Sequence, residues 1–126
     1  MSDSRPGGLH GRRLLVVEDD YMIAVELVRA LEELGVQVVG PAGSVEQALA
    51  LLGQEKERLD GAVLDINLHG ERVYPVADAL AARGLPYIFA TGYDATAIPE
   101  PYSQVPRCEK PVDKAQLARL LARHKF

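Results

Sequence analysis

Short apolar runs alternate along this chain with segments in which apolar residues recur every three or four positions. A continuous apolar run of about four to six residues is typical of a strand that is covered on both faces. Spacing of three and four residues instead gathers apolar side chains on one face of a helix. Runs of the first kind predict strands at residues 14–17, 36–39, 61–65 and 86–91, and the less apolar residues 105–109 predict a fifth.

Helices are predicted between and after these strands. Their apolar positions span residues 23–34, 45–52, 73–80 and 117–121. Gly35, Gly53 and Gly84 stand where the first three helices should end. Residues 93–106 contain three prolines and leave room for at most one helical turn, near residues 95–98. Repeated strand–helix units predict an α/β fold, with a parallel sheet covered by helices on both faces.

The composition narrows the class of protein. The chain has 126 residues, which is the size of one domain. Its formal net charge of −4 argues against nucleic-acid binding. The single cysteine, Cys108, is typical of a reducing compartment, and no apolar run is long enough to span a membrane, so a cytoplasmic protein is predicted. We expect a flexible tail at residues 1–11 and one domain at residues 12–126.

Reactive polar residues follow or end four of the predicted strands. In doubly wound sheets the carboxyl ends of the strands meet at one edge, where ligands bind. Carboxylates follow the first strand and end the third, a threonine ends the fourth, and a lysine follows the fifth. These residues are Glu18, Asp19, Asp20, Asp65, Thr91 and Lys110. Each is ordinary alone, since an acidic residue after a strand is usually a solvated helix cap, but together they predict one site.

The predicted site gathers more negative than positive charge, which favours a bound cation. Two carboxylates about 5 Å apart repel by roughly 3 kcal/mol at an effective dielectric constant near 20. Oxygen ligands suit Mg²⁺, which would be held by Asp19 and Asp65. A carboxylate can also accept a phosphoryl group as an acyl phosphate. We therefore predict Asp65 as the nucleophile, with Thr91 and Lys110 contacting the phosphoryl oxygens.

Four short segments carry a resemblance to a known family. Residues 15–20, 64–68, 90–92 and 109–111 read LVVEDD, LDINL, ATG and EKP. With these motifs, residues 12–125 resemble the receiver domain of two-component response regulators. The resemblance implies a flavodoxin-like, doubly wound sheet of five parallel strands in the order 2-1-3-4-5, and a cis peptide bond before Pro111. The prolines after the fourth strand imply a shortened or irregular fourth helix.

The resemblance also implies a role for each site residue. Asp65 is the phosphoacceptor, Thr91 the switch hydroxyl and Lys110 the phosphate-binding lysine. Mg²⁺ is held by the side chains of Glu18, Asp19 and Asp65 and by the backbone carbonyl of Asn67. Such a domain is not an enzyme with a separate substrate, because it catalyses only its own phosphorylation and dephosphorylation. Its partner is a sensor histidine kinase or a phosphotransfer protein; it relays or drains the signal through protein contacts, and homodimerisation is left open.

Two departures from the family pattern, Arg107 and the fourth helix interrupted by prolines, bear on how a signal leaves the domain, and His69 is a further, smaller one. Arg107 stands three residues before the lysine, where most receivers carry tyrosine or phenylalanine. Residues 86–93, PYIFATGY, instead resemble the P-F-x-F-A-T-G-Y motif of the FATGUY receivers, with Tyr87 in place of phenylalanine. His69 replaces a proline that is common in receivers. We therefore expect activation to order residues 92–106 rather than to turn an aromatic side chain.

Two other functions stay open as alternatives. A Mg²⁺-dependent phosphohydrolase or nuclease needs an Asp-x-Asp pair, and the corresponding pair here is Asp65 and the uncharged Asn67. A protein-interaction module that works without phosphorylation would not need Asp65, Thr91 and Lys110, all of which are present. Only 16 residues follow Lys110, so a stand-alone receiver without an output domain is expected.

Overall fold

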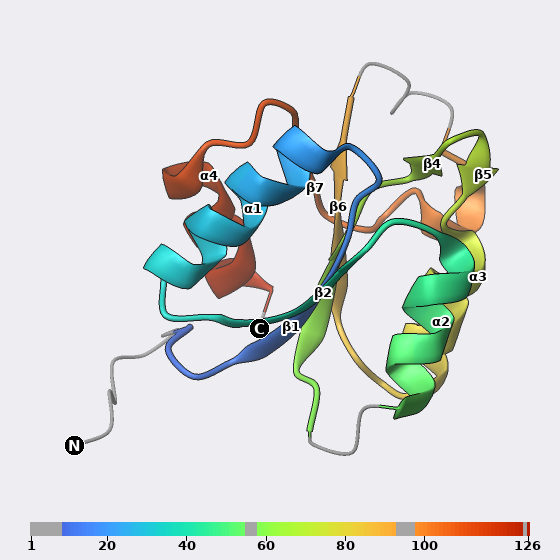
Figure 1. Ribbon diagram of the computed structural model, residues 1–126, viewed down its shortest axis with the longest axis horizontal. Helices are drawn as coiled ribbons and strands as arrows, with labels where there is room; N and C mark the ends of the chain where they lie inside the picture. The colour runs from blue at the N-terminus through green and yellow to red at the C-terminus, as the bar shows by residue number, and fades with distance from the viewer. Residues whose placement is uncertain (1–8, 55–57, 93–97, 125) are drawn as a thin grey trace.

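A five-stranded parallel sheet forms the central layer of the molecule (Figure 1). The computed structural model describes residues 9–54, 58–92, 98–124 and 126, to which all structural statements refer. The strands of the sheet are β1 (Arg13–Val17), β2 (Gln37–Ala42), β3 (Gly61–Leu64), β6 (Tyr87–Thr91) and β7 (Arg107–Glu109). Their order across the sheet, β2-β1-β3-β6-β7, confirms the predicted flavodoxin-like arrangement.

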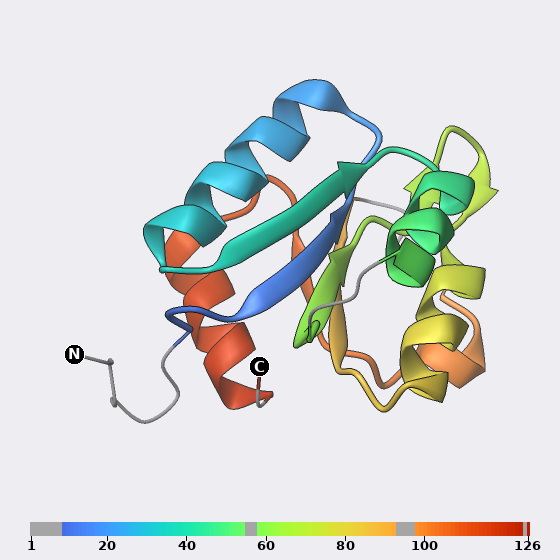
Figure 2. The ribbon, with the colours of Figure 1, turned by 60° about the horizontal axis from the view of Figure 1, so that its bottom comes forward.

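Helices cover both faces of the sheet in two pairs (Figures 1 and 2). They are α1 (Tyr21–Glu33), α2 (Val45–Gln54), α3 (Tyr74–Ala82) and α4 (Lys114–Arg123). α1 and α4 pack on the face that carries Val16 and Ile88, whereas α2 and α3 pack on the face that carries Leu64 and Phe89. In β1, β3 and β6, alternate residues therefore enter opposite cores, as the continuous apolar runs predict.

The first helix begins and ends at the signals that its sequence contains. Asp20 precedes α1, and its side chain accepts a hydrogen bond from the backbone N–H of Ile23 at 3.1 Å. Gly35 follows the helix with a φ of 89°, the left-handed conformation that glycine adopts without steric cost. The predicted end of this helix is therefore confirmed.

Three other predicted boundaries are wrong, and one of them is the start of β7, which begins at Arg107 instead of residue 105. α2 continues through Gly53 to Gln54, because Gly53 does not adopt the left-handed conformation that ends a helix. β2 continues through Gly40 and Pro41 to Ala42 instead of ending at residue 39. Because β2 lies at the edge of the sheet, a proline that lacks an N–H donor is tolerated there.

A small hairpin after β3 is a feature that the apolar pattern does not predict. β4 (Asn67–Leu68) pairs antiparallel with β5 (Glu71–Arg72). The turn between them consists of His69 and Gly70, whose φ angles of 51° and 86° are both left-handed. Leu68 is buried in the core and anchors one side of the hairpin. Strands of two residues are too short to leave a periodic apolar signal.

The connection between β6 and β7 is only partly covered by the structure. Residues 93–97 lie outside the described part of the chain, and with them most of the helical turn predicted at residues 95–98. The ordering predicted for residues 92–106 on activation falls partly there too. Within residues 98–106 the chain forms the 3₁₀ turn η2 (Glu100–Tyr102).

An aromatic stack holds this connection against α3. The ring of Tyr102 lies parallel to that of Tyr74, with the two ring centroids 4.3 Å apart. The Tyr102 hydroxyl donates a hydrogen bond to Asp78 Oδ1 at 2.8 Å, and this bond, together with burial, raises the pKa of Tyr102 to about 12. Tyr74 in turn packs edge-on against Phe89 of β6. The contacts thus run from η2 through α3 to the central sheet.

The first residues that the structure describes are packed against the rest of the domain. Leu9 is buried, and the backbone N–H of Gly11 donates a hydrogen bond to the carbonyl of Gly35 at 2.8 Å. The predicted division into a tail at residues 1–11 and a domain at residues 12–126 stays a prediction. No helix within the described residues is long and apolar enough to cross a membrane.

Variants of Tyr102 should measure how strongly the stack holds the connection. Tyr102→Phe keeps the ring on Tyr74 but removes the hydrogen bond to Asp78, so we expect the free energy of unfolding to fall by about 1 kcal/mol. Tyr102→Ala also removes the stack and should cost roughly 1 kcal/mol more. Urea unfolding measures both values. In an Asp78→Ala background, Tyr102→Phe should have almost no effect, and an undiminished cost there would contradict the role of this hydrogen bond.

Candidate functional site

The ends of the strands bring the predicted site residues together at one edge of the sheet. Backbone hydrogen bonding continues past the strand ends, since the N–H of Glu18 bonds to β2 and that of Asp65 bonds to β1, both at 2.8 Å. On the other side of the sheet, the N–H of Lys110 donates to the carbonyl of Thr91 at 2.9 Å. These hydrogen bonds fix the backbone of Glu18, Asp65 and Lys110, whose side chains form the site.

Lys110 forms ion pairs with two of the carboxylates. Its Nζ lies 2.6 Å from Glu18 Oε1 and 3.3 Å from Asp65 Oδ1. The side chains of Lys110, Glu18 and Asp65 are only 15%, 1% and 9% exposed, so water and salt screen these contacts weakly. Glu18 Oε2 also accepts a hydrogen bond from the N–H of Asp20 at 3.1 Å. Glu18 is therefore a buried anchor that holds Lys110 beside Asp65.

A third carboxylate, Asp19, completes an acidic cluster. One oxygen from each of Glu18, Asp19 and Asp65 lies within 4.8 Å of the others. With all three ionised, one lysine leaves the cluster with an excess of two negative charges. The donors are all carboxylate oxygens, which are ligands for hard divalent cations such as Mg²⁺. The surplus charge and the donor chemistry both fit a divalent cation.

The pKa of Asp65 reflects this crowding. Burial raises it most and repulsion by Glu18 raises it further, while Lys110 opposes both, so that it rises from 3.8 to about 7. Burial lowers the pKa of Lys110, but its contacts with Glu18 and Asp65 outweigh burial and raise it overall. Lys110 is therefore an ammonium ion at neutral pH, while Asp65 is divided between its neutral and ionised forms.

Two further predicted site residues lie at the end of β6 and at the start of β4. Thr91 is the last residue of β6, and it is buried. The side chain of Asn67 accepts a hydrogen bond from the N–H of Gly70 at 3.0 Å, so it belongs to the hairpin turn. This leaves the backbone carbonyl of Asn67 as the group that the family resemblance assigns to the metal. The roles of both residues stay predictions.

His69 is a neighbour of the cluster that the residue pattern does not single out. Its backbone N–H donates a hydrogen bond to Asp19 Oδ2 at 2.8 Å, and its Nδ1 lies 3.3 Å from the same oxygen. The sequence signals at this position are the departure from the proline that is common in receivers and a histidine–glycine pair after the third strand. Such a pair is compatible with a turn of two left-handed residues, although histidine is uncommon at positive φ.

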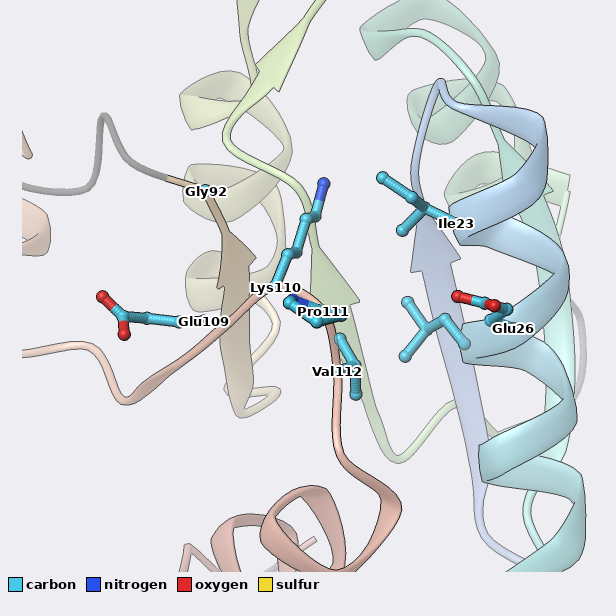
Figure 3. A pocket seen from close by; sticks show the side chains of 8 residues that line it. Ile23, Glu26, Gly92, Glu109, Lys110, Pro111 and Val112 are labelled. Carbon is cyan, nitrogen blue, oxygen red and sulfur yellow. The ribbon is translucent and has the colours of Figure 1, made fainter.

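The side chains of β7 divide between the core and solvent. Cys108 is buried, and burial raises the pKa of its thiol, which makes it unreactive. Arg107 and Glu109, on either side of it, are exposed. Figure 3 shows Glu109 pointing away from Lys110, so this carboxylate lies outside the acidic cluster. No aromatic side chain of β7 can therefore pair with Thr91.

A cavity of about 440 Å³ lies beside the cluster, between α1 and the loop from β7 to α4 (Figure 3). Ile23 and Leu27 line it from α1, and Pro111 and Val112 line it from the loop. Lys110 also contributes to its wall. The cavity therefore borders a lysine whose side chain is only 15% exposed.

Solved structures resemble this chain, whereas no protein-family model and no curated protein matches it. SdrG from Sphingomonas melonis Fr1 is 38% identical over 89% of this chain and 94% of that one, with a TM-score of 0.79. The BeF3-activated conformation of SdrG from Pseudomonas melonis Fr1 is 35% identical over 94% and 99%, with a TM-score of 0.70. A CheY-like response regulator receiver domain from Methylobacillus flagellatus, 23% identical over 90% and 98%, shares the fold with a TM-score of 0.76.

Asp65→Asn should change how the stability of the metal-free protein depends on pH. A carboxyl whose pKa rises on folding, here from 3.8 to about 7, stabilises the fold fully below about pH 4 and loses this contribution as the pH rises through 7. One pKa unit corresponds to about 1.4 kcal/mol, so the loss is at most about 4 kcal/mol. Asparagine resembles the neutral carboxyl, so the variant should match the wild type near about pH 4 and be more stable near about pH 8.

Urea unfolding in the presence of a chelator measures this difference across the pH range. Glu109→Gln is the matched control, because its carboxylate is exposed and points away from the cluster. The control should keep the wild-type pH profile. If Asp65→Asn also keeps it, the raised pKa of Asp65 is refuted.

Proposed function

Because the chain belongs to the receiver domains of response regulators, we propose that it accepts a phosphoryl group on Asp65 and thereby changes its contacts with other proteins. One observation supports this above all: a largely buried lysine, Lys110, lies 3.3 Å from Asp65 and is held there by Glu18. A lysine in this position can bind phosphoryl oxygens once the group has been transferred. The donor would be a phosphorylated histidine of a sensor kinase or of a phosphotransfer protein.

The residues that would hold Mg²⁺ are the side chains of Glu18, Asp19 and Asp65 and the backbone carbonyl of Asn67. The surplus negative charge of the cluster supports this assignment, because Lys110 balances only one of the three carboxylates. When bound, Mg²⁺ neutralises charge on the oxygens of the phosphoryl group. The pKa of Asp65 falls when a cation lies beside it, so that the carboxylate is ionised and able to attack at neutral pH.

In the proposed phosphoryl transfer, Asp65 is the nucleophile. One of its oxygens attacks the phosphorus atom, and an O–P bond forms while the N–P bond to the donor imidazole breaks. The electron pair of the broken bond stays on the imidazole nitrogen, which takes up a proton. Lys110 moves its hydrogen bonds from the carboxylate to a phosphoryl oxygen, and the Thr91 hydroxyl donates to another.

The return reaction needs only water. A water oxygen attacks the phosphorus of the acyl phosphate, the bond between phosphorus and Asp65 breaks, and the carboxylate is restored with release of inorganic phosphate. The domain thus acts on itself and has no separate substrate. Whether it relays or drains phosphoryl groups depends on how this hydrolysis compares with transfer to a partner.

We also propose that the chain belongs to the FATGUY subgroup, because of the motif at residues 86–93. The exposed side chain of Arg107 supports this, since β7 offers Thr91 no aromatic partner. A signal would then leave through the connection that begins at Gly92. The stack of Tyr102 on Tyr74 ties the end of this connection to α3, so that movement at Thr91 would reach a surface helix.

Phosphorylation itself is the first test. Wild-type protein incubated with acetyl phosphate and Mg²⁺ should gain the mass of one phosphoryl group, measured on the intact protein. Asp65→Asn should gain none. Asp60→Asn is the matched control, because Asp60 precedes the opposite end of β3 and contacts Arg58 instead of Lys110. Labelling of Asp65→Asn to the same extent as the control would refute the phosphoacceptor assignment.

Removal of one carboxylate should weaken metal binding. Asp19→Asn takes away a ligand and part of the surplus charge, so Mg²⁺ affinity should fall at least about tenfold, or about 1.4 kcal/mol, in isothermal titration calorimetry. The metal-free variant should be as stable as the wild type or more stable, because repulsion is relieved. Glu109→Gln removes a nearby carboxylate that points away from the cluster and should bind Mg²⁺ normally. Equal affinities of all three proteins would exclude Asp19 as a ligand.

A further inference from the structure

The turn of the β4–β5 hairpin holds its backbone in a conformation that its own residues do not favour. His69 has a φ of 51°, in the left-handed region that non-glycine residues seldom adopt. Two contacts maintain it: Leu68 is 2% exposed and anchored in the core, and Asn67 Oδ1 accepts the N–H of Gly70 at 3.0 Å. Strained backbone conformations that are kept in place by surrounding contacts cluster at functional sites.

This conformation directs the backbone N–H of His69 to a single atom of the acidic cluster. The N–H donates to Asp19 Oδ2 at 2.8 Å, and the imidazole Nδ1 lies 3.3 Å from the same oxygen. The Asp19 side chain is 14% exposed, whereas the His69 side chain is 81% exposed. Water therefore screens the imidazole contact, while the backbone contact is short and is fixed by the turn.

We propose that His69 is a positioning residue for Asp19, and that its backbone N–H turns this carboxylate toward the cation. The inference rests on the proposed function, in which Asp19 binds Mg²⁺. Both His69 contacts fall on Oδ2, so Oδ1 is left for the cation. A carboxylate with one oxygen tied to the backbone loses less rotational freedom when its other oxygen binds a metal. Partners that hold a ligand in this way typically change metal affinity by about 10- to 100-fold when they are removed.

Two substitutions at this position separate the backbone from the side chain. His69→Gly removes the imidazole but keeps the N–H and tolerates positive φ. His69→Pro removes the N–H, and its ring fixes φ near about −65°. In calorimetric titrations with Mg²⁺, His69→Gly should bind within about threefold of the wild type, whereas His69→Pro should bind at least about tenfold more weakly.

Gly70→Ala controls for strain in the turn. Its Cβ would meet no atom within 4 Å, but Gly70 has a φ of 86°, so the variant strains the hairpin while it keeps the N–H of His69. It should bind Mg²⁺ within about threefold of the wild type. A second measurement requires neither metal nor a folded proline variant. The amide proton of His69 in metal-free wild type should exchange slowly with solvent, and Asp19→Asn should shift its resonance upfield and speed this exchange.

The Mg²⁺ affinities of the variants and the amide resonance of His69 together test the role of His69. Weak Mg²⁺ binding by His69→Pro alone, with the expected amide shift, supports it. Wild-type affinity in His69→Pro, or an equal loss in His69→Gly, overturns it and leaves the phosphoacceptor role of Asp65 intact. If His69→Pro does not fold, the amide measurement decides. The inference is then overturned when Asp19→Asn changes neither the resonance nor the exchange rate of the His69 amide proton. A wild type that neither binds Mg²⁺ nor accepts a phosphoryl group refutes the proposed function, and the inference with it.

Discussion

Repulsion among Glu18, Asp19 and Asp65 is the constraint on which the site depends. The three carboxylates cannot move apart, because the backbone hydrogen bonds of the sheet continue past the strand ends and hold Glu18 and Asp65. The two apolar cores, one on each face, hold the strands themselves. Lys110 offsets only part of the charge. The metal-free fold is therefore less stable than the same fold with a cation or a proton at this edge.

In the proposed function, this instability favours the chemistry of the site. A carboxylate that is crowded and partly covered gains from any change that removes its charge or pairs it with a cation. A lysine held in place by Glu18 does not need to be ordered when a phosphoryl group arrives. If the proposed function holds, the same buried groups that cost the domain stability also prepare it for the proposed phosphorylation of Asp65.

Most of the sheet and the acidic cluster could be predicted from the sequence, because strand ends in a parallel sheet meet at one edge. Glu18, Asp65 and Lys110 therefore came together from positions far apart in the chain. The contribution of His69 could not be predicted, since it comes from a backbone N–H and residue type does not reveal such a donor. The wrong boundaries at Gly53 and Pro41 also depend on the backbone. Gly53 stays within α2, because it does not adopt the left-handed conformation that ends a helix. Pro41 stays within β2, because a residue without an N–H donor is tolerated in an edge strand.

The Tyr74–Tyr102 stack has a practical consequence for anyone who studies the protein in solution. The chain contains five tyrosines and no tryptophan, so tyrosine emission is not masked. A stacked tyrosine whose hydroxyl is bonded to a carboxylate differs in its emission from a solvated one such as Tyr21, which is 78% exposed. Any separation of η2 from α3 would therefore alter the ultraviolet fluorescence of the unlabelled chain. The domain carries its own optical probe at the connection between β6 and β7.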